Sequence, residues 1–235
     1  MLIGEKGIKK LLKSKVIVFG VGGVGSFVVE ALARAGVGHL VLVDPDTIEV
    51  TNINRQLPAL FSTIGKYKVD VLKNRVEDIN PQAMVDIFRE EATPKNVNGY
   101  IESNISYVVD AIDVVKSKLA IIEESLNINI PIISAMGAGN RLDPSKFKIS
   151  DISETSCCPL ARIMRKELRK RDIKSGIKVL YSTETPVDTF LSNDSVEVEI
   201  NNKRENTRQI GSISFMPSVA GLLMAGCVVN DILNN

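Results

Sequence analysis

The chain has 235 residues, with 29 lysines and arginines, 28 aspartates and glutamates, and a net charge of +1. The overall charge therefore points to no class of partner, and the length allows one large domain with a substantial core. Three cysteines in a chain of this length exclude a disulfide framework and indicate a reducing, cytoplasmic compartment. A single histidine and the absence of a Cys-x-x-Cys pair argue against a structural zinc site.

Apolar runs and helical patterns alternate along the chain, which predicts an α/β fold with a Rossmann-like, mostly parallel sheet and flanking helices. The predicted strands are 16–20, 39–43, 83–88, 106–110, 131–135 and a strand near 146–150. The predicted helices are 25–36, 65–79, 115–127, 159–171 and 217–232. Residues 183–209 are polar and rich in Asn and Pro turns, so we expect a loop or a weak hairpin there.

Glycines interrupt the chain directly after the first strand. The β-branched run at 16–19 ends at Gly20, and a helical pattern opens after Gly25. Gly20 permits a tight turn, Gly22 and Gly23 let backbone N–H groups approach a phosphate, and Gly25 allows close packing of helix and strand. The helix N-terminus then presents free N–H groups to an anion. This segment predicts a nucleotide-phosphate loop.

Asp44 ends the second predicted strand, 19 residues after Gly25. This spacing suits a carboxylate that accepts hydrogen bonds from a ribose hydroxyl. The loop and the placed acid together predict a Rossmann-type nucleotide site.

The charged residues that follow discriminate between nucleotides. Arg55 and Lys68 add two positive charges to the predicted site. The glycine loop largely suffices to hold the two phosphates of a dinucleotide. Two additional cations suit a triphosphate, because its negative charge grows as the α-phosphate is attacked. Asp110 and Asp113 end the fourth strand, at the edge where ligands bind, and a carboxylate there suits Mg²⁺. Each residue alone is compatible with a surface or structural role, but the combination favours ATP with Mg²⁺.

The chain resembles the ThiF/MoeB/HesA group of adenylating enzymes, which are relatives of ubiquitin-activating enzymes. The residues that carry the resemblance are Gly20-Val-Gly22-Gly23-Val-Gly25-Ser26, Asp44, Asp46, Asn52-Ile-Asn54-Arg55-Gln56, Lys68 and Asp110-Ala-Ile-Asp113. The resemblance implies that the glycines and Asp44 hold ATP, that Asp46 and Asn54 shape its site, and that Gln56 and Asp110 belong to the nucleotide-binding set. It also implies that Arg55 and Lys68 contact the phosphates and that Asp113 is the metal ligand, so that these three carry the chemistry.

The second half resembles the tRNA threonylcarbamoyladenosine dehydratase branch of this group. The matching segments are 134–144, 151–152, 155–156, 159–162, 165–171, 181–184 and 211–221. The resemblance implies a homodimer that adenylates the carboxylate of threonylcarbamoyladenosine in tRNA, after which the ureido group attacks, AMP leaves and a ring forms. It implies one adenylating domain over 1–235, with an ATP-binding half at 1–136. Residues 137–235 would then extend the sheet, bind substrate and form the dimer interface.

A basic segment independently indicates a nucleic-acid substrate. Residues 162–178 contain eight lysines and arginines and two acids, a local charge of +6. The cations that recur at helical spacing are Arg162, Arg165, Lys166, Arg169 and Lys170. One helix face could therefore follow the phosphates of tRNA, although a solvated helix with salt bridges gives the same pattern.

One segment resembles a membrane span. Residues 210–230 contain no charged residue. The length of this segment is about that of a helix that crosses a bilayer. Pro217 lies near its middle, so the helix should begin there, and Gly221, Ala225 and Gly226 give it a small-residue face. We expect a buried or interface helix and no membrane span.

Other functions remain open from the sequence alone. Activation of the C-terminal carboxylate of a small ubiquitin-like sulfur-carrier protein fits the ATP half equally well, with a carrier or sulfur-transfer partner. An NAD-dependent dehydrogenase also fits the bare glycine pattern, but the sole histidine, His39, lies at the wrong edge of the sheet for an acid/base. A nucleotide-sensing module is a weaker alternative. We expect Cys157 and Cys158 to be structural or incidental, because adjacent cysteines make a poor metal site and ring closure needs no cysteine nucleophile.

The resemblance also implies an arginine upstream of Leu2 that reaches the partner subunit's ATP. The chain begins at Met1 without it. A chain extended upstream is therefore expected to adenylate faster, by roughly 10²–10³ if one preorganised cation is regained.

Overall fold

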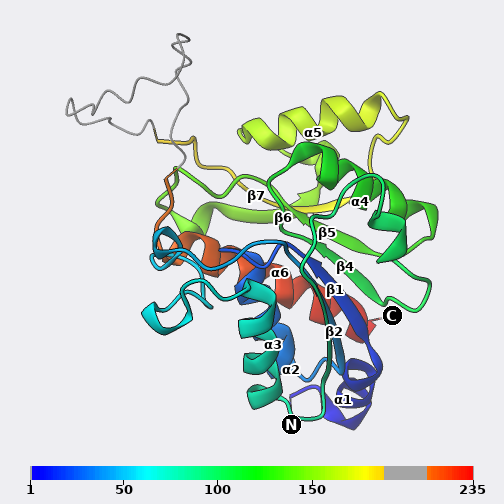
Figure 1. The fold of residues 1–235 in the computed structure, drawn as a ribbon. Coiled ribbons are helices and arrows are strands. Elements are labelled where there is room, and N and C mark those ends of the chain that lie inside the picture. The colour runs from blue at the N-terminus through cyan, green and yellow to red at the C-terminus, as the bar shows by residue number, and fades with distance from the viewer. Residues whose placement is uncertain (1, 188–210, 235) are drawn as a thin grey trace, which may run out of the picture.

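The computed structural model describes residues 2–187 and 211–234. One sheet of seven strands has the order β3-β2-β1-β4-β5-β7-β6, and every neighbouring pair is parallel except β7 and β6 (Figure 1). The strands are β1 (Lys15–Phe19), β2 (His39–Val43), β3 (Met84–Phe88), β4 (Tyr107–Asp110), β5 (Ile132–Ala135), β6 (Phe147–Asp151) and β7 (Lys178–Ser182). The predicted α/β class and mostly parallel sheet are confirmed.

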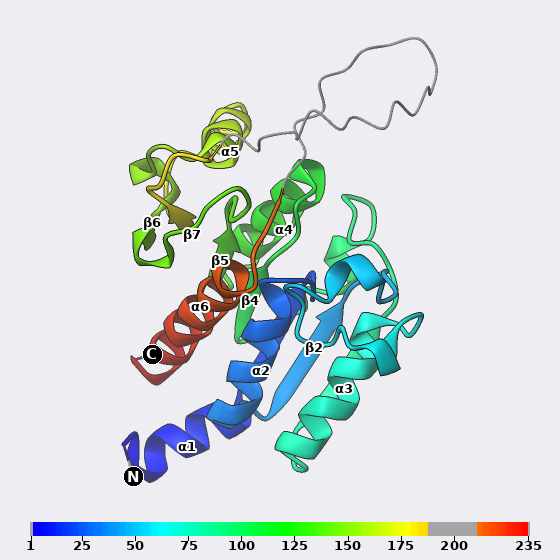
Figure 2. The ribbon, with the colours of Figure 1, turned by 90° about the vertical axis from the view of Figure 1, so that its left-hand side faces the viewer.

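Helices cover both faces of the sheet. They are α1 (Gly4–Lys13), α2 (Gly25–Ala35), α3 (Lys68–Ile79), α4 (Val115–Asn127), α5 (Pro159–Arg169) and α6 (Phe215–Asn234). The alternation of β1 explains the two layers, because successive side chains of a strand point to opposite faces. Val16 and Val18 pack with α1, α2, α3 and α6, whereas Ile17 and Phe19 pack with α4 and α5 (Figures 1 and 2).

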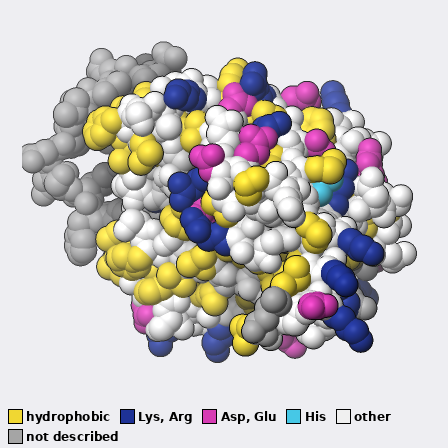
Figure 3. Space-filling view, turned by 90° about the horizontal axis from the view of Figure 1, so that it is seen from below, with side chains coloured by type: hydrophobic (Ala, Val, Ile, Leu, Met, Phe, Trp, Pro, Cys, Tyr) yellow, Lys and Arg dark blue, Asp and Glu magenta, His cyan; other side chains and the backbone are white. Residues whose placement is uncertain are grey.

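The last helix, α6, lies alongside α2 (Figure 2). Gly221 makes this contact possible, because a Cβ there would stand 2.4 Å from the Val24 carbonyl oxygen. By length and composition alone α6 could cross a membrane. Its buried residues Met216, Ala220 and Met224 nevertheless lie in the core with β1 and α2, as the small-residue pattern predicts. Figure 3 shows the molecule from below the view of Figure 1, where hydrophobic side chains lie in patches between charged ones.

The structure contains two elements that the sequence analysis did not predict. Helix α1 precedes the first strand and buries Leu11 in the core, and β7 inserts between β5 and β6. The predicted helix at 65–79 begins later, at Lys68, because Thr47 and Tyr67 form a β-bridge that holds the Tyr67 backbone extended. Of the predicted loop at 183–209, the part at 188–209 lies outside the described residues.

Candidate active site

The candidate site lies at the carboxyl edge of the sheet, where the strand order reverses between β1 and β4. Crevices at such reversals are the usual ligand sites of open α/β sheets. The glycine loop is built there as the sequence predicts. Gly20 has a φ of +78°, and a Cβ on it would stand 2.8 Å from the Ala111 carbonyl oxygen. A Cβ on Gly25 would stand 1.8 Å from the Gly20 carbonyl oxygen, so helix and strand approach as closely as backbone permits.

Two further glycines let side chains from other segments approach the loop closely. A Cβ on Gly22 would stand 3.6 Å from Gln56, and one on Gly23 would stand 3.1 Å from Pro217, at the start of α6. The Cγ of Arg55 lies 3.7 Å from the same position at Gly23, so its side chain passes beside the glycine loop. The structure therefore brings Arg55 and Gln56, predicted from a distant motif, to the glycine loop.

Asp44 holds this loop from the end of β2. Its Oδ2 accepts a hydrogen bond from the Val21 N–H at 2.8 Å, and its Oδ1 accepts one from the Asp46 N–H at 2.9 Å. Burial raises the pKa of the Asp44 carboxyl, and the positive charge of Lys68 opposes that rise. Each carboxylate oxygen keeps a second lone pair, as the predicted ribose contact requires.

Lys68 is the first residue of α3, and its Nζ lies 2.6 Å from the Asp46 Oδ2. The lysine side chain is 6% exposed and the aspartate side chain 60% exposed, so the cation lies beneath an open carboxylate. A cavity of about 380 Å³ opens beside this pair. Its lining residues are Pro45, Asp46, Thr47, Glu49, Asn52, Tyr67 and Lys68. Both predicted residues thus face a cavity next to Asp44.

The Asn54-Arg55-Gln56 motif presents polar groups toward the loop. The Arg55 Nη1 donates to the Asn54 Oδ1 at 2.9 Å and to the Thr51 carbonyl oxygen at 2.8 Å. Gln56 is buried, and its Oε1 has no hydrogen-bond partner. A buried unpaired acceptor is costly, so it indicates a missing donor such as a ligand or water. The motif therefore carries donors and a free acceptor beside the glycine loop.

The two acids after β4 have different positions. Asp110 is fully buried, and its Oδ2 lies 2.9 Å from the Lys118 Nζ and accepts a hydrogen bond from the Ser134 hydroxyl. Its Oδ1 accepts from the Ile112 N–H. The predicted nucleotide contact of Asp110 stays a prediction; in the structure its carboxylate is buried at the end of β4, where it holds the loop that follows this strand. Asp113, in contrast, is exposed.

The sequence analysis missed Lys118. Its Nζ donates to the Ile112 carbonyl oxygen at 3.0 Å as well as pairing with Asp110, so both polar groups of the Ile112 backbone are held. Lysines are rarely buried unless paired. The only sequence signal for this role is its position: Lys118 lies in the first turn of α4, the helix that follows the carboxylate at the end of β4.

Helix α5 carries the predicted basic face. It buries Ala161, Met164 and Leu168 against the α4 side of the sheet. Arg162, Lys166 and Arg169 are exposed. These three cations are therefore available to a polyanion.

Two of the five predicted phosphate contacts are engaged within the protein. Arg165 turns back and donates to the Thr155 carbonyl oxygen at 2.8 Å. Lys170 pairs with Glu167 at 2.7 Å. The basic face of α5 thus offers fewer available cations than the helical spacing predicted.

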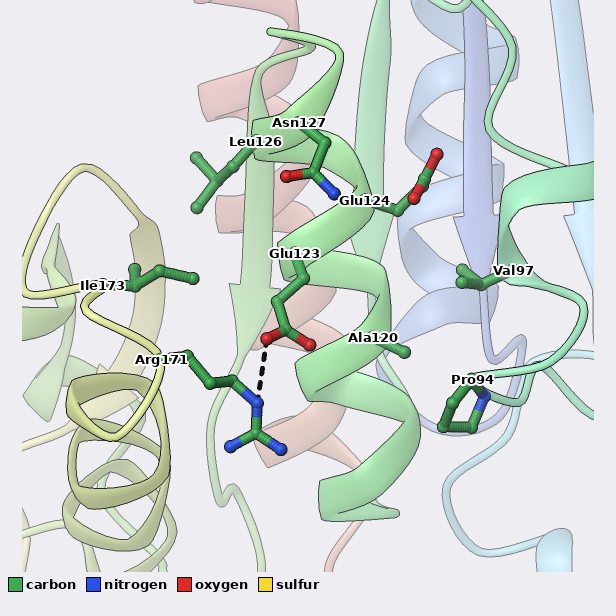
Figure 4. A pocket seen from close by; sticks show the side chains of 9 residues that line it. All are labelled: Pro94, Val97, Ala120, Glu123, Glu124, Leu126, Asn127, Arg171 and Ile173. Carbon is green, nitrogen blue, oxygen red and sulfur yellow. Dashed lines mark ion pairs between the residues drawn. The ribbon is translucent and has the colours of Figure 1, made fainter.

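A second cavity, of about 460 Å³, lies along α4, and its lining comes from α4, from the chain that follows α5 and from the segment at 94–97 (Figure 4). Its lining residues are Pro94, Val97, Ala120, Glu123, Glu124, Leu126, Asn127, Arg171 and Ile173. Figure 4 shows Arg171 directed toward Glu123, and the two side chains pair at 2.8 Å. None of the predicted site residues lines it.

Metal-binding clusters of three or more His, Cys, Asp or Glu residues do not occur within residues 2–187 and 211–234. The three cysteines are free: Cys157 is exposed, Cys158 is buried and Cys227 is half-buried. His39, the sole histidine, lies at the amino edge of β2, with its Nε2 2.7 Å from the Asp86 Oδ2. It is therefore remote from the glycine loop, as the sequence predicts.

Comparison with known proteins gives a consistent result. The model of the ThiF family matches residues 1–235. A tRNA threonylcarbamoyladenosine dehydratase of Bacillus subtilis (strain 168) is 44% identical over 239 residues, which cover 100% of this chain and 93% of the relative. The crystal structure of Escherichia coli tRNA N6-threonylcarbamoyladenosine dehydratase, TcdA, in complex with ATP superposes with a TM-score of 0.87 and 31% identity, over 99% of this chain and 91% of that one. The adenylyltransferase and sulfurtransferase MOCS3 of Culex quinquefasciatus is 35% identical over 132 residues, which cover 56% of this chain and 30% of that protein.

Proposed function

Because the chain belongs to the ThiF family, we propose that it is an ATP-dependent tRNA threonylcarbamoyladenosine dehydratase. The observation that carries the proposal is the 44% identity to the B. subtilis dehydratase over the whole chain. The sulfurtransferase relative matches only 56% of the chain. That shorter match fits the ATP half alone, so activation of a carrier protein is the second candidate.

The first step would be adenylation. A carboxylate oxygen of threonylcarbamoyladenosine attacks the α-phosphorus of ATP, a P–O bond to the substrate forms, and the bond to pyrophosphate breaks. Arg55 lies beside the glycine loop and Lys68 lines the cavity at Asp46, and both would stabilise the charge that grows on the phosphates. Asp44 would accept from the ribose, and the unpaired Gln56 Oε1 offers an acceptor to the nucleotide.

The second step would be ring closure. The ureido group attacks the activated acyl carbon, AMP departs with the former carboxylate oxygen, and the nucleoside loses the elements of water. AMP is a good leaving group, so this step needs no covalent link to the protein. Cys157 and Cys158 fit a structural role.

Asp113 fits a magnesium ligand. It is an exposed carboxylate at the carboxyl edge, and Mg²⁺ commonly binds through one or two carboxylates together with substrate phosphates. The ion would neutralise phosphate charge there when bound. Asp110 cannot share this role without leaving its ion pair with Lys118.

The exposed cations of α5 would contact the tRNA backbone. Replacing Arg162, Lys166 and Arg169 with glutamine should raise the KM for tRNA. It should also reduce the slope of the logarithm of the tRNA affinity against the logarithm of the salt concentration, by about one for each phosphate that is no longer neutralised. Glutamine at Lys6, Lys9 and Lys13, which are exposed on α1, makes the same charge change at a remote helix and serves as the control. Equal effects of the two triple variants would assign the weaker binding to net charge and contradict an RNA-binding role for α5.

We also propose that the protein is a homodimer. Leu222 and Leu223 are 50% and 41% exposed on α6, on a helix whose other face is buried in the core. Burying such side chains against a second copy would remove apolar area from water. Light scattering should give twice the mass of the chain, and Leu222→Lys with Leu223→Lys should give a monomer; a monomeric unsubstituted protein would contradict the proposal.

The decisive experiment combines the protein, ATP and Mg²⁺ with tRNA that carries threonylcarbamoyladenosine. The nucleoside should lose the mass of one water while AMP and pyrophosphate are released. Lys68→Ala should slow this reaction by roughly 10²–10³, whereas Lys73→Ala, an exposed lysine on the same helix, should not. An unchanged nucleoside together with pyrophosphate exchange driven by a carrier protein would favour the second candidate.

A further inference from the structure

Asn140 lies in the loop after β5 and joins two other segments of the chain. Its carbonyl oxygen accepts a hydrogen bond from the Val187 N–H at 2.7 Å, and its own N–H donates to the Gly211 carbonyl oxygen at 2.9 Å. The Gly211 N–H in turn donates to the Asn140 Oδ1 at 2.6 Å. A single residue thus fixes the chain after β7 and the chain before α6 to the same loop.

The connection continues to the phosphate-binding motif. The carbonyl oxygen of Ser212, the residue after Gly211, accepts a hydrogen bond from the Asn54 Nδ2 at 2.9 Å. The Asn54 Oδ1 then accepts from the Arg55 Nη1 at 2.9 Å. An unbroken series of hydrogen bonds and a short stretch of backbone therefore connects Asn140 to the side chain that passes beside Gly23.

The backbone of Asn140 limits which residues can occupy this position. Its φ is 56°, in the left-handed region that glycine, asparagine and aspartate adopt at low cost. Glycine would preserve the backbone but remove the Oδ1 acceptor, whereas aspartate would preserve both. The side chain and the conformation can therefore be tested separately.

We propose that Asn140 is a positioning residue for Arg55. It holds the backbone at 211–212, which holds Asn54, which orients the Arg55 guanidinium toward the phosphates of ATP. Donors that are oriented in advance need no rearrangement when charge develops, and a flexible arginine gains most from such support. The inference rests on the proposed ATP-dependent function and assigns a role to a residue that does not itself touch the nucleotide.

Calorimetric titration of ATP, without tRNA, tests the inference. Asn140→Gly should raise the Kd of ATP about three- to tenfold, the usual worth of one hydrogen bond, and Asn140→Asp should stay within about twofold of the unsubstituted protein. In turnover assays Asn140→Gly should raise the KM for ATP and leave the KM for tRNA unchanged. Asn129→Gly is the matched control, because Asn129 also has a left-handed backbone, with a φ of 57°. It lies between the C-terminal end of α4 and the start of β5, whereas Asn140 lies after the end of β5.

A double-mutant cycle keeps the test independent of stability. In an Asn54→Ala background, which already lacks the connection, Asn140→Gly should have no further effect on ATP binding. An unchanged Kd in Asn140→Gly, or additive effects in the double variant, would overturn the inference. A protein that binds ATP but leaves the tRNA nucleoside unchanged would instead contradict the proposed function, and the ATP titrations would still decide the role of Asn140.

Discussion

Replacement of Lys118 by methionine tests the support beneath the candidate site. Lys118 and Asp110 form an ion pair at 2.9 Å, and both side chains are 0% exposed. Methionine has a similar length but no charge, so the variant would leave a buried carboxylate without its cation. Breaking a buried pair from one side typically costs about 3–5 kcal/mol. For a chain of this size, that cost corresponds to a fall in Tm of about 6–20 °C.

The measurement is chemical and thermal denaturation followed by circular dichroism. Lys116→Met removes an exposed lysine from the same helix and should change the free energy of unfolding by no more than about 0.5 kcal/mol. Adding Asp110→Asn to Lys118→Met should recover much of the stability, because the double variant buries no charge. If Lys118→Met were as stable as Lys116→Met, the burial and pairing argument would be refuted.

Three further predictions concern other parts of the structure. The hydroxyl of the buried Tyr107 donates to the Asp231 Oδ2 at 2.7 Å, so Asp231→Ala leaves that hydroxyl without its acceptor and should lower the free energy of unfolding by about 1–3 kcal/mol. Adding Tyr107→Phe should restore part of this loss. If it restored none, the unpaired hydroxyl would not be the cause of the loss. Gly25→Ala places a Cβ 1.8 Å from the Gly20 carbonyl oxygen and should abolish ATP binding in calorimetry, whereas Gly99→Ala, with open space around it, should leave binding intact. Burial raises the pKa of Asp44, so its carboxylate gains a proton at a higher pH than an ordinary aspartate, and ATP affinity should fall as the pH is lowered through that raised pKa. Asp44→Asn should bind weakly at every pH; if it showed the same fall, another group would be responsible.

The glycine loop and its strands could be predicted because local backbone requirements determine them. Gly20 needs a positive φ and Gly25 needs backbone contact, and both requirements are visible as glycine in the sequence. The strands flanking the loop are short, β-branched and almost fully buried, which gives a strong local signal. Elements whose stability comes from such local patterns were predicted to within a few residues.

The missed elements depend on long-range packing. Helix α1 has only ten residues, four of them lysines, and of its apolar side chains Ile8, Leu11 and Leu12 only Leu11 is buried in the core. Strand β7 is a five-residue run that becomes a strand by pairing with β5 and β6, which are distant in sequence. Tertiary context routinely overrides such weak local preferences.

The roles of charged residues were the hardest part of the site to predict. Asp110 and Asp113 are three residues apart, yet one is fully buried and the other exposed. Arg165 shares its helical spacing with Arg162 but bends back to Thr155. The spacing of charged residues in the sequence predicts which of them lie on the same helix or strand. The partner of each charge depends on residues from other parts of the chain, and the spacing carries no information about those.

The close packing of α6 on α2 has a consequence for the order in which the protein can be completed on the ribosome. The half that contains the glycine loop leaves the ribosome first, but Met216, Ala220 and Met224 occupy the same core as Val16 and Val18. Until the twenty residues of α6 emerge, one side of the nascent sheet lacks part of its covering and presents apolar surface to chaperones. A ribosome stalled before α6 would therefore hold a chain that contains every predicted nucleotide-binding motif and still lacks the helix that completes the core behind them.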